Sequence, residues 1–351
     1  MLIFLKHILF QIIFILLFSV SVFAEFVVGL YGVKTTTDVI KAKEAGFNCV
    51  QTYIKEPDVI DLLAREAKNN EIKLIAYPDK VFSSKYREIA TKYPIKAWYL
   101  FDEPDVWRLS REEVIALNKR AKTIYPKNET AFVIGEGLTE MSYYDIGDIL
   151  MVDWYPVPHL PLESFGENVA LAKRCLKMIG QSSKELWGVV QIFNWKEYKQ
   201  FRPDEDRIGR FPKKEEIRFM SYDAIFNGAN GVFYFTCYSE NEPLYETKKE
   251  KWKDVVDVIQ EMSFVAEIID NGKEIENPIK IEEPLKAKSF EYGGIKYTVI
   301  INPTAKKQTL PIFFFQSQFD VIYEKSTNLK KIVRKTKNNF LPYKVLVFRY
   351  E

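Results

Sequence analysis

The sequence predicts an α/β protein, a (β/α)8 or TIM barrel followed by a small C-terminal β-sandwich. Three observations predict this fold. Residues 25–272 alternate apolar runs of strand length with helical stretches, which gives eight strand–helix units in succession. From residue 273 to residue 351 short strands with polar turns take over. The 351 residues suffice for one large α/β domain and one small second domain.

The segment 1–24 is predicted to be a signal peptide and not part of the fold. Lys6 and His7 precede an apolar run that ends at Val22-Phe23-Ala24, which has the small-x-small pattern of a cleavage site. We therefore expect cleavage after Ala24, a secreted or periplasmic protein, and no stable membrane insertion once the signal is removed. An uncleaved membrane anchor is the alternative, because the apolar run is only marginally long enough to span a bilayer.

The expected barrel strands follow one another at regular intervals. They cover residues 26–33, 47–54, 72–79, 95–105, 129–136, 148–157, 185–195 and 231–240. The helices between them are expected from Thr35, over 57–70, near 84–93, from Ser110, and over 164–180, 214–229 and 252–270. Ser110 and Glu113 have the spacing of a capping box at a helix start.

The C-terminal segment is expected to fold as a β-sandwich over 273–351. Residues 288–302 have the pattern of a hairpin that turns at Gly293-Gly294. Further short strands are expected at 310–315, 319–325, 330–335 and 343–350. The sequence contains no internal repeat with a period of 20–50 residues.

Composition excludes several classes of function. The net charge of +2 gives no reason to expect nucleic acid or an anionic membrane as a partner. Beyond the signal, His159 is the only histidine, and the three cysteines are far apart, so we expect neither a metal site nor a disulfide framework. Glycine-rich loops that cradle phosphates are absent from the sequence, and no cofactor is expected.

Acidic residues follow several of the expected strands. Barrel enzymes carry their sites at the carboxyl ends of the strands, and here strand four ends in Asp102-Glu103-Pro104-Asp105 and strand six in Asp153. Cleavage of a glycosidic bond needs a carboxylic acid beside the leaving oxygen. Glu103 is the candidate for this acid, because an apolar strand and the neighbouring Asp102 would raise its pKa.

Each of these assignments has a structural alternative. Glu103 could instead form an ion pair with Arg108 or Arg218, and Asp153 could cap a turn before Tyr155-Pro156. Glu136 and Glu240 are expected to be solvated, although either could face the cleft. Side chains that could bind a sugar by stacking or hydrogen bonding are Tyr31, Gln51, Tyr53, Tyr77, Trp154, Tyr155, Gln191 and Trp195. For each of these, simple packing is an equally good explanation.

Asp102-Glu103-Pro104 resembles the Asn-Glu-Pro motif of the large retaining clan of barrel glycoside hydrolases. The segment EEIRFMSYDAIFNGANGVFYF is similar to one found in secreted barrels of this type. The resemblance implies an exported glycoside hydrolase that acts on a poly- or oligosaccharide, with Glu103 as general acid/base. This chain departs from the clan at strand seven, where the clan has a nucleophilic glutamate and the sequence offers Gln191.

Two carboxylates could take the second catalytic role. An adjacent Asp102-Glu103 pair is similar to that of N-acetylhexosaminidases, in which the acetamido group of the substrate attacks. Alternatively Asp153 is the partner, as the resemblance to barrel α-galactosidases with carboxylates on strands four and six implies. Two other hypotheses remain: a non-catalytic barrel that binds carbohydrate, which Gln191 favours, and a structural envelope protein.

Overall fold

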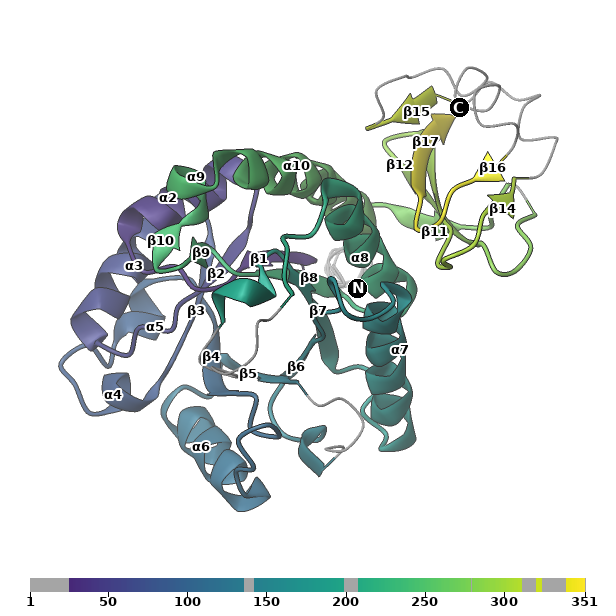
Figure 1. Ribbon diagram of the computed structural model, residues 1–351. Coiled ribbons are helices and arrows are strands. Elements are labelled where there is room, and N and C mark those ends of the chain that lie inside the picture. The colour runs from purple at the N-terminus through teal and green to yellow at the C-terminus, as the bar shows by residue number, and fades with distance from the viewer. Residues whose placement is uncertain are drawn as a thin grey trace, which may run out of the picture.

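The computed structural model describes residues 25–135, 142–198, 208–278, 280–310, 320–323 and 339–350. Eight parallel strands close a barrel in sequence order, with β8 pairing back onto β1 (Figure 1). Their bounds are β1 (Val27–Leu30), β2 (Cys49–Gln51), β3 (Lys73–Ala76), β4 (Ile95–Asp102), β5 (Glu129–Ile134), β6 (Ile149–Asp153), β7 (Glu185–Gln191) and β8 (Gly231–Phe235). The predicted barrel is confirmed, whereas the expected signal peptide and Glu136 lie outside the described residues.

Helices surround the barrel, as the sequence pattern predicts. The longer ones are α2 (Thr36–Ala45), α3 (Pro57–Asn69), α6 (Arg111–Ile124), α7 (Glu163–Met178), α8 (Lys214–Phe226) and α10 (Lys249–Asn271). The capping box is confirmed: the Ser110 side chain accepts a hydrogen bond from the backbone N–H of Glu113, and the Glu113 carboxylate accepts one from the backbone N–H of Ser110. Among the described residues, no helix is long and apolar enough to cross a membrane.

One predicted helix is wrong. Instead of a helix near 84–93 the chain forms two single turns, α4 (Asp79–Phe82) and α5 (Ile89–Lys92). Between them the Ser84 hydroxyl donates to the Val81 carbonyl and accepts from the Tyr86 N–H. Such local side-chain bonds to the backbone compete with the helical hydrogen-bond ladder, which explains the interruption.

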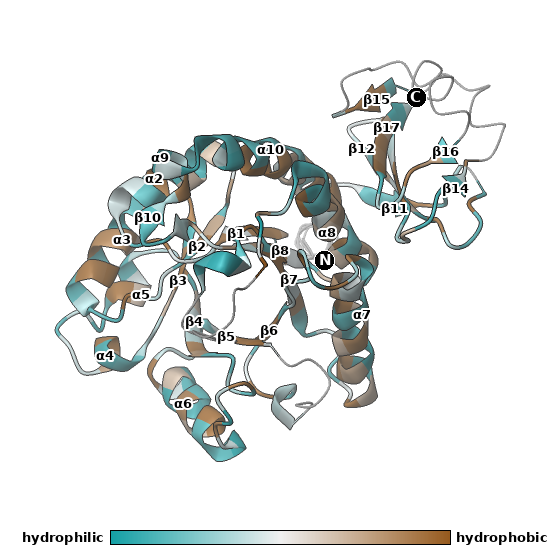
Figure 2. Ribbon diagram, in the orientation of Figure 1, coloured by the Kyte–Doolittle hydropathy of each residue, from teal (hydrophilic) through white to brown (hydrophobic). Residues whose placement is uncertain are grey.

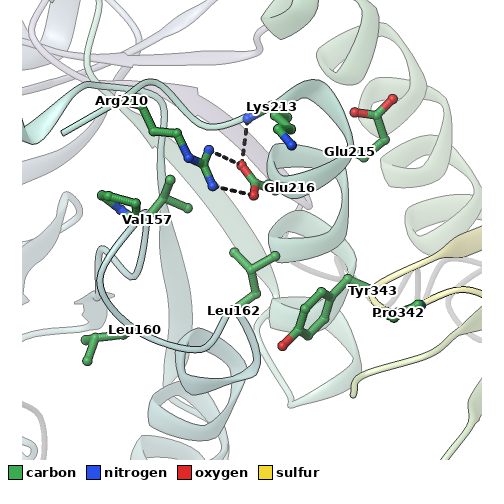
Figure 3. Close-up of a pocket in the computed structure, with 10 residues that line it drawn as sticks. Val157, Leu160, Leu162, Arg210, Lys213, Glu215, Glu216, Pro342 and Tyr343 are labelled. Carbon is green, nitrogen blue, oxygen red and sulfur yellow. Dashed lines mark hydrogen bonds and ion pairs between the residues drawn. The ribbon is translucent and has the colours of Figure 1, made fainter. Parts of the chain in front are cut away.

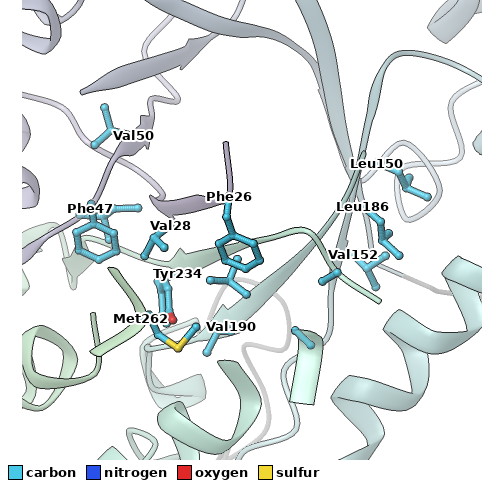
Figure 4. Close-up of a cluster of buried hydrophobic side chains, with 14 of the residues drawn as sticks. Phe26, Val28, Phe47, Val50, Leu150, Val152, Leu186, Val190, Tyr234 and Met262 are labelled. Carbon is cyan, nitrogen blue, oxygen red and sulfur yellow. The ribbon is translucent and has the colours of Figure 1, made fainter. Parts of the chain in front are cut away.

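The barrel interior is a packed core and not a pore. Gly29 leaves room for the ring of Phe233, because a Cβ atom at this glycine would lie 2.2 Å from the ring. The same ring stacks on Trp187, with centroids 5.5 Å apart. A second apolar layer fills the space between strands and helices, and Figure 4 shows Met262 of α10 within it. Figure 2 shows apolar residues along the strands and mixed polarity on the surrounding helices.

The C-terminal region is built of antiparallel sheets, in agreement with the short strands that the sequence predicts from residue 273 onwards. Five strands pair in the order β11 (Lys273–Ile275), β12 (Lys286–Tyr292), β13 (Ile295–Ile301), β17 (Val345–Tyr350) and β15 (Asp320–Ile322). A two-stranded sheet of β14 (Gln308–Thr309) and β16 (Asn339–Phe340) shares an apolar cluster with it. The strands expected at 310–315 and 330–335 fall largely or wholly outside the described residues.

A buried ion pair joins this region to the barrel. Arg218 of α8 donates three hydrogen bonds of 2.8–3.0 Å to the Glu261 carboxylate of α10. It also donates to the carbonyl of Val345 at the start of β17, at 2.8 Å. Glu261 accepts a further bond from the Tyr222 hydroxyl. Arg218 is therefore committed to the domain junction, which removes it as an ion-pair partner for Glu103.

Candidate active site at the barrel mouth

The end of β4 carries a β-bulge that determines which way its acidic residues face. Tyr99 pairs with Ala131 of β5, but Asp102 pairs with Val133, so three steps along β4 match two along β5. Tyr99 faces the barrel interior, and strict alternation would turn Asp102 towards the helices. The extra residue reverses this, and Asp102 points inward.

Asp102 is held by two tyrosine hydroxyls. Its Oδ1 accepts hydrogen bonds from Tyr99 (2.6 Å) and Tyr53 (3.2 Å). Burial raises the pKa of Asp102 and outweighs these hydrogen bonds and the charge of Lys55, which lower it. Asp102 is thus fixed in position, with its proton affinity increased.

Glu103 follows in an unusual backbone conformation. Its φ of +47° lies in the left-handed region, which costs a non-glycine residue about 1–2 kcal/mol. Its N–H donates to the carbonyl of Val133 on β5. Its carboxyl group lies over Gly135, where a Cβ atom would come 2.8 Å from Oε1. Asp105, 1% exposed, accepts the N–H of the same glycine.

The carboxyl groups of Glu103 and Asp153 are in hydrogen-bond contact. Asp153 lies at the end of β6, is 7% exposed, and accepts a bond from the Tyr155 hydroxyl on Oδ2. Burial first, then the charge and hydrogen bond of Glu103, raise the pKa of Asp153 well above its usual range. Two ionised carboxylates cannot share a hydrogen bond, so the pair retains one proton.

Aromatic rings line the mouth beside this pair. Tyr155 stacks on Phe235 of β8, with centroids 5.6 Å apart, and its carbonyl accepts the indole N–H of Trp195 at 3.2 Å. Tyr53, Tyr155 and Trp195 are all partly exposed, and therefore accessible to a ligand. Tyr77, 7% exposed, lies under the Lys55 ammonium, which is 4.5 Å from the ring centroid.

Other predicted sugar-binding residues do not reach the mouth surface. Trp154 points outward, because Asp153 and Tyr155 on either side of it point inward, and its indole N–H donates to Ser164 Oγ beside α7. The prediction that it forms a sugar-stacking wall is therefore wrong. Tyr31 is 1% exposed, and its hydroxyl contacts Tyr99 and Met151 within the barrel core.

Both predicted glutamines are fully buried. The Gln191 amide accepts from the N–H of Val157 at 2.9 Å and donates to the carbonyls of Val157 and Phe193. This glutamine therefore holds the loop after β6 and presents no free group to a ligand. Gln51 accepts from the N–H of Gly32, and its Nε2 has no partner among the described residues.

The sequence interpretation missed Glu197. This residue ends a 3-10 turn (Trp195–Glu197) in the loop after β7, six residues beyond the strand end, Gln191, at which the retaining clan has its carboxylate. It lines a cavity of about 340 Å³ with Tyr53 and Phe235. Burial raises the pKa of Glu197. Its position two residues after Trp195, a predicted sugar-binding residue, could have indicated Glu197 from the sequence. The polar sequence around it, however, is typical of a solvated loop.

A second cavity, of about 330 Å³, lies at the junction with the C-terminal region (Figure 3). Its residues come from the loop after β6, from the start of α8 and from the loop before β17. Arg210 forms a bidentate ion pair with Glu216 at its edge, and Tyr343 donates to the Glu163 carboxylate. Of the charged residues that line this cavity, Arg210 and Glu216 are thus paired with each other. Among the described residues, no group of three or more His, Cys, Asp or Glu side chains is arranged to hold a metal ion.

Comparisons with known proteins bear on the fold. A scan against protein-family models and a search of curated protein sequences find no match. Similar solved structures include Amy13B of Eubacterium rectale, with a TM-score of 0.57 and 9% identity over 93% of this chain and 96% of that one.

Two further structures are similar to a comparable degree. A GH30 endoxylanase from Clostridium papyrosolvens C71 has a TM-score of 0.55 and 12% identity over 93% of this chain and 96% of its own. A family 39 glycoside hydrolase from Bacteroides cellulosilyticus WH2 has a TM-score of 0.55 and 11% identity over 92% of this chain and 80% of its own. At such identities the likeness is one of fold: the chain has the (β/α)8-barrel fold that these glycoside hydrolases share.

Proposed function

We propose that this protein is a glycoside hydrolase in which Glu103 is the general acid/base and Asp153 the second carboxylate. The observation that carries the proposal is the contact between these two carboxyl groups at the end of the barrel strands. Barrel enzymes have their sites at this end. Glycosidic bond cleavage requires such a pair of carboxyl groups.

The shared proton suits the first step of the reaction. Glu103 donates it to the glycosidic oxygen as the bond to the leaving group breaks, and Asp153 is then left as the carboxylate that faces the oxocarbenium-like centre. The two groups are closer than the about 6.5–9.5 Å that an inverting pair needs for its water, and closer also than the about 5–5.5 Å of a retaining pair. We propose a retaining mechanism, the nearer of the two, in which the carboxyl groups move apart to admit the scissile bond, Asp153 attacks and Glu103 later activates water.

Asp102 has a supporting role in this scheme. Its negative charge raises the pKa of Asp153 and so helps to keep the proton in the pair. The two tyrosine hydroxyls that bind it hold it in place, so it is not free to attack the substrate. We propose a carbohydrate substrate that contacts the partly exposed aromatic residues of the mouth, Tyr53, Tyr155 and Trp195, and we propose that the protein is exported.

The test is a screen of the wild type and Glu103→Gln on chromogenic glycosides and on polysaccharides, with release of reducing ends as the readout. We expect hydrolysis by the wild type and a loss of at least about 100-fold in the variant. Glu112→Gln, at an exposed position on α6, is the matched control and should behave as wild type. Equal rates for wild type and Glu103→Gln would refute the proposal. Sugar binding without hydrolysis by the wild type would support a non-catalytic carbohydrate-binding barrel instead.

A further inference from the structure

The cavity lined by Glu197 has the size of a pocket for one small ring. Its volume of about 340 Å³ is at the lower end for ligand pockets in proteins. It lies at the ends of β1, β2 and β8 and is lined by Gly32, Lys34, Tyr53, Ile54, Glu197, Tyr198, Phe235, Thr236, Tyr238, Glu240 and Asn241. Four of these residues are aromatic, which suits an organic ring with polar substituents.

The carboxylate of Glu197 is only weakly bonded by the protein around it. Its Oε2 is buried and has no hydrogen-bond partner of good geometry among the described residues. The hydroxyl of Ser239, a residue that is 3% exposed, lies beside this carboxylate, and its hydrogen bond lowers the pKa of Glu197, but the contact falls short of full hydrogen-bond geometry. Buried polar atoms are nearly always well paired, so a weakly bonded carboxylate that lines a cavity points to a ligand that supplies a further contact.

The charges around Glu197 favour a cation. Glu240, which also lines the cavity, raises the pKa of Glu197, whereas Lys248, which does not line it, lowers the pKa. Among the described residues that line the cavity, Lys34 is the only cationic one, and its ammonium already lies 3.9 Å from the centroid of the Tyr238 ring. Two carboxylates and aromatic walls therefore remain to receive a positive group.

Hydrogen bonds within the protein hold the part of the cavity wall that follows β8 in place without a ligand. Asp38, 0% exposed, accepts hydrogen bonds from the hydroxyls of Tyr238 (2.9 Å) and Tyr245 (2.6 Å) and from two backbone N–H groups at the start of α2. These bonds fix the short hairpin of β9 (Tyr238–Ser239) and β10 (Glu242–Pro243) that follows the barrel. On the opposite side Tyr53 lines the cavity and donates to Asp102, which links the cavity to the catalytic carboxylates.

We propose that this cavity binds one amino-sugar residue with a free, protonated amine, whose ammonium group lies between Glu197 and Glu240. The proposal rests on the glycoside hydrolase function and names its substrate class. The sugar ring would pack against the aromatic walls, and the ammonium would donate to the Glu197 carboxylate. An N-acetylated sugar carries no positive charge and a larger substituent, and a neutral hexose gains nothing from the two carboxylates.

The experiment is calorimetric titration of the full chain with D-glucosamine and D-galactosamine, compared with D-glucose, D-galactose and N-acetyl-D-glucosamine. Free monosaccharides contain no bond to be cleaved, so binding is measured apart from hydrolysis. We expect at least one amino sugar to bind about tenfold or more tightly than its neutral parent, as a desolvated cation on carboxylates and aromatic rings should. High salt should reduce this difference.

Variants test which carboxylates cause the preference for the amino sugar. Glu197→Gln should abolish the preference for the amino sugar, and Glu240→Gln, at an exposed position, should reduce it. Glu242→Gln in the same hairpin does not line the cavity and should retain the full preference. Absence of amino-sugar binding, equal affinity for the neutral parents, or a preference that survives Glu197→Gln would each overturn the proposal. Failure here leaves the effect of Glu103→Gln on hydrolysis untouched, so the two proposals fail separately.

Discussion

Gly135 lies directly beneath the carboxyl group of Glu103. A Cβ atom at this glycine would come 2.8 Å from Oε1 of Glu103 and 3.1 Å from a methyl group of Val106. The end of β5 thus leaves the space that the carboxyl group of Glu103, the proposed catalytic acid, occupies. In this way the identity of one small residue controls the position of the group that we propose donates the proton.

Gly135→Ala is therefore expected to reduce hydrolysis by about 100-fold, because a displacement of a catalytic group by about 1 Å has an effect of this order. Stability should change little, since the end of the Glu103 side chain can move aside. Steady-state kinetics and thermal unfolding measure the two effects. Gly180→Ala is the control: it adds a Cβ in open space at a φ of +76°, and should lower stability without affecting activity. Full activity of Gly135→Ala would show that the placement of Glu103 over this glycine is unimportant.

The shared proton predicts the pH profile. Hydrolysis should fall as the pH rises through the raised pKa of Asp153, because the pair then loses the proton that Glu103 must donate. The alkaline limb of kcat/KM should thus lie well above about 4, the usual range of a carboxyl group. In Asp102→Asn the limb should move to lower pH, because the charge of Asp102 helps to raise the pKa of Asp153. An alkaline limb of kcat/KM at the same pH in Asp102→Asn as in the wild type would contradict this explanation.

Gln191 should matter for stability more than for sugar binding. Gln191→Leu leaves the buried N–H and carbonyl of Val157 without partners, and we expect a loss of about 1–3 kcal/mol in the free energy of unfolding. Urea denaturation measures it. Gln260→Leu on the exposed face of α10 should stay within about 0.5 kcal/mol of wild type. A Gln191→Leu protein of normal stability but weakened sugar affinity would restore the original prediction that this residue binds substrate.

The Arg218–Glu261 pair should dominate the attachment of the C-terminal region. Glu261→Gln leaves the buried guanidinium without its counter-charge, and a loss of about 3–5 kcal/mol in unfolding free energy is expected. Hydrogen exchange should become faster in β17, because Arg218 also binds the Val345 carbonyl. Asp257→Asn is the matched control, since Lys214–Asp257 joins the same two helices but is half exposed, and should cost at most about 1 kcal/mol. Equal losses in the two variants would contradict the special role of the buried pair.

The barrel could be predicted because its signal is repeated eight times and depends on apolar runs that need no precise boundary. Each strand lies inside its predicted range, although β2 is only three residues long. The helix predicted near 84–93 fails because a single serine hydroxyl competes for the backbone. Local competition of this kind is decided by geometry, which composition does not reveal.

The site was harder to predict than the barrel, because it depends on the direction in which each side chain points from its strand. Glu103 and Asp153 were identified as strand-end carboxylates, and the structure brings them into contact. Trp154 was misplaced although simple alternation from Asp153 would have turned it outward. Asp102 faces inward only because of a bulge, which no residue pattern in β4 announces. Glu197 was missed because its burial depends on segments far away in the sequence.

The central claim is that Glu103 protonates the leaving group, and the most direct measurement varies that group. Wild type and Glu103→Gln are compared on a series of aryl glycosides of one sugar, from dinitrophenyl to unsubstituted phenyl. The expected result is a small loss for dinitrophenyl, which needs no proton to depart, and a loss of about 100-fold or more for phenyl. A loss of equal size across the whole series, or none, would contradict the assignment of Glu103 as the acid.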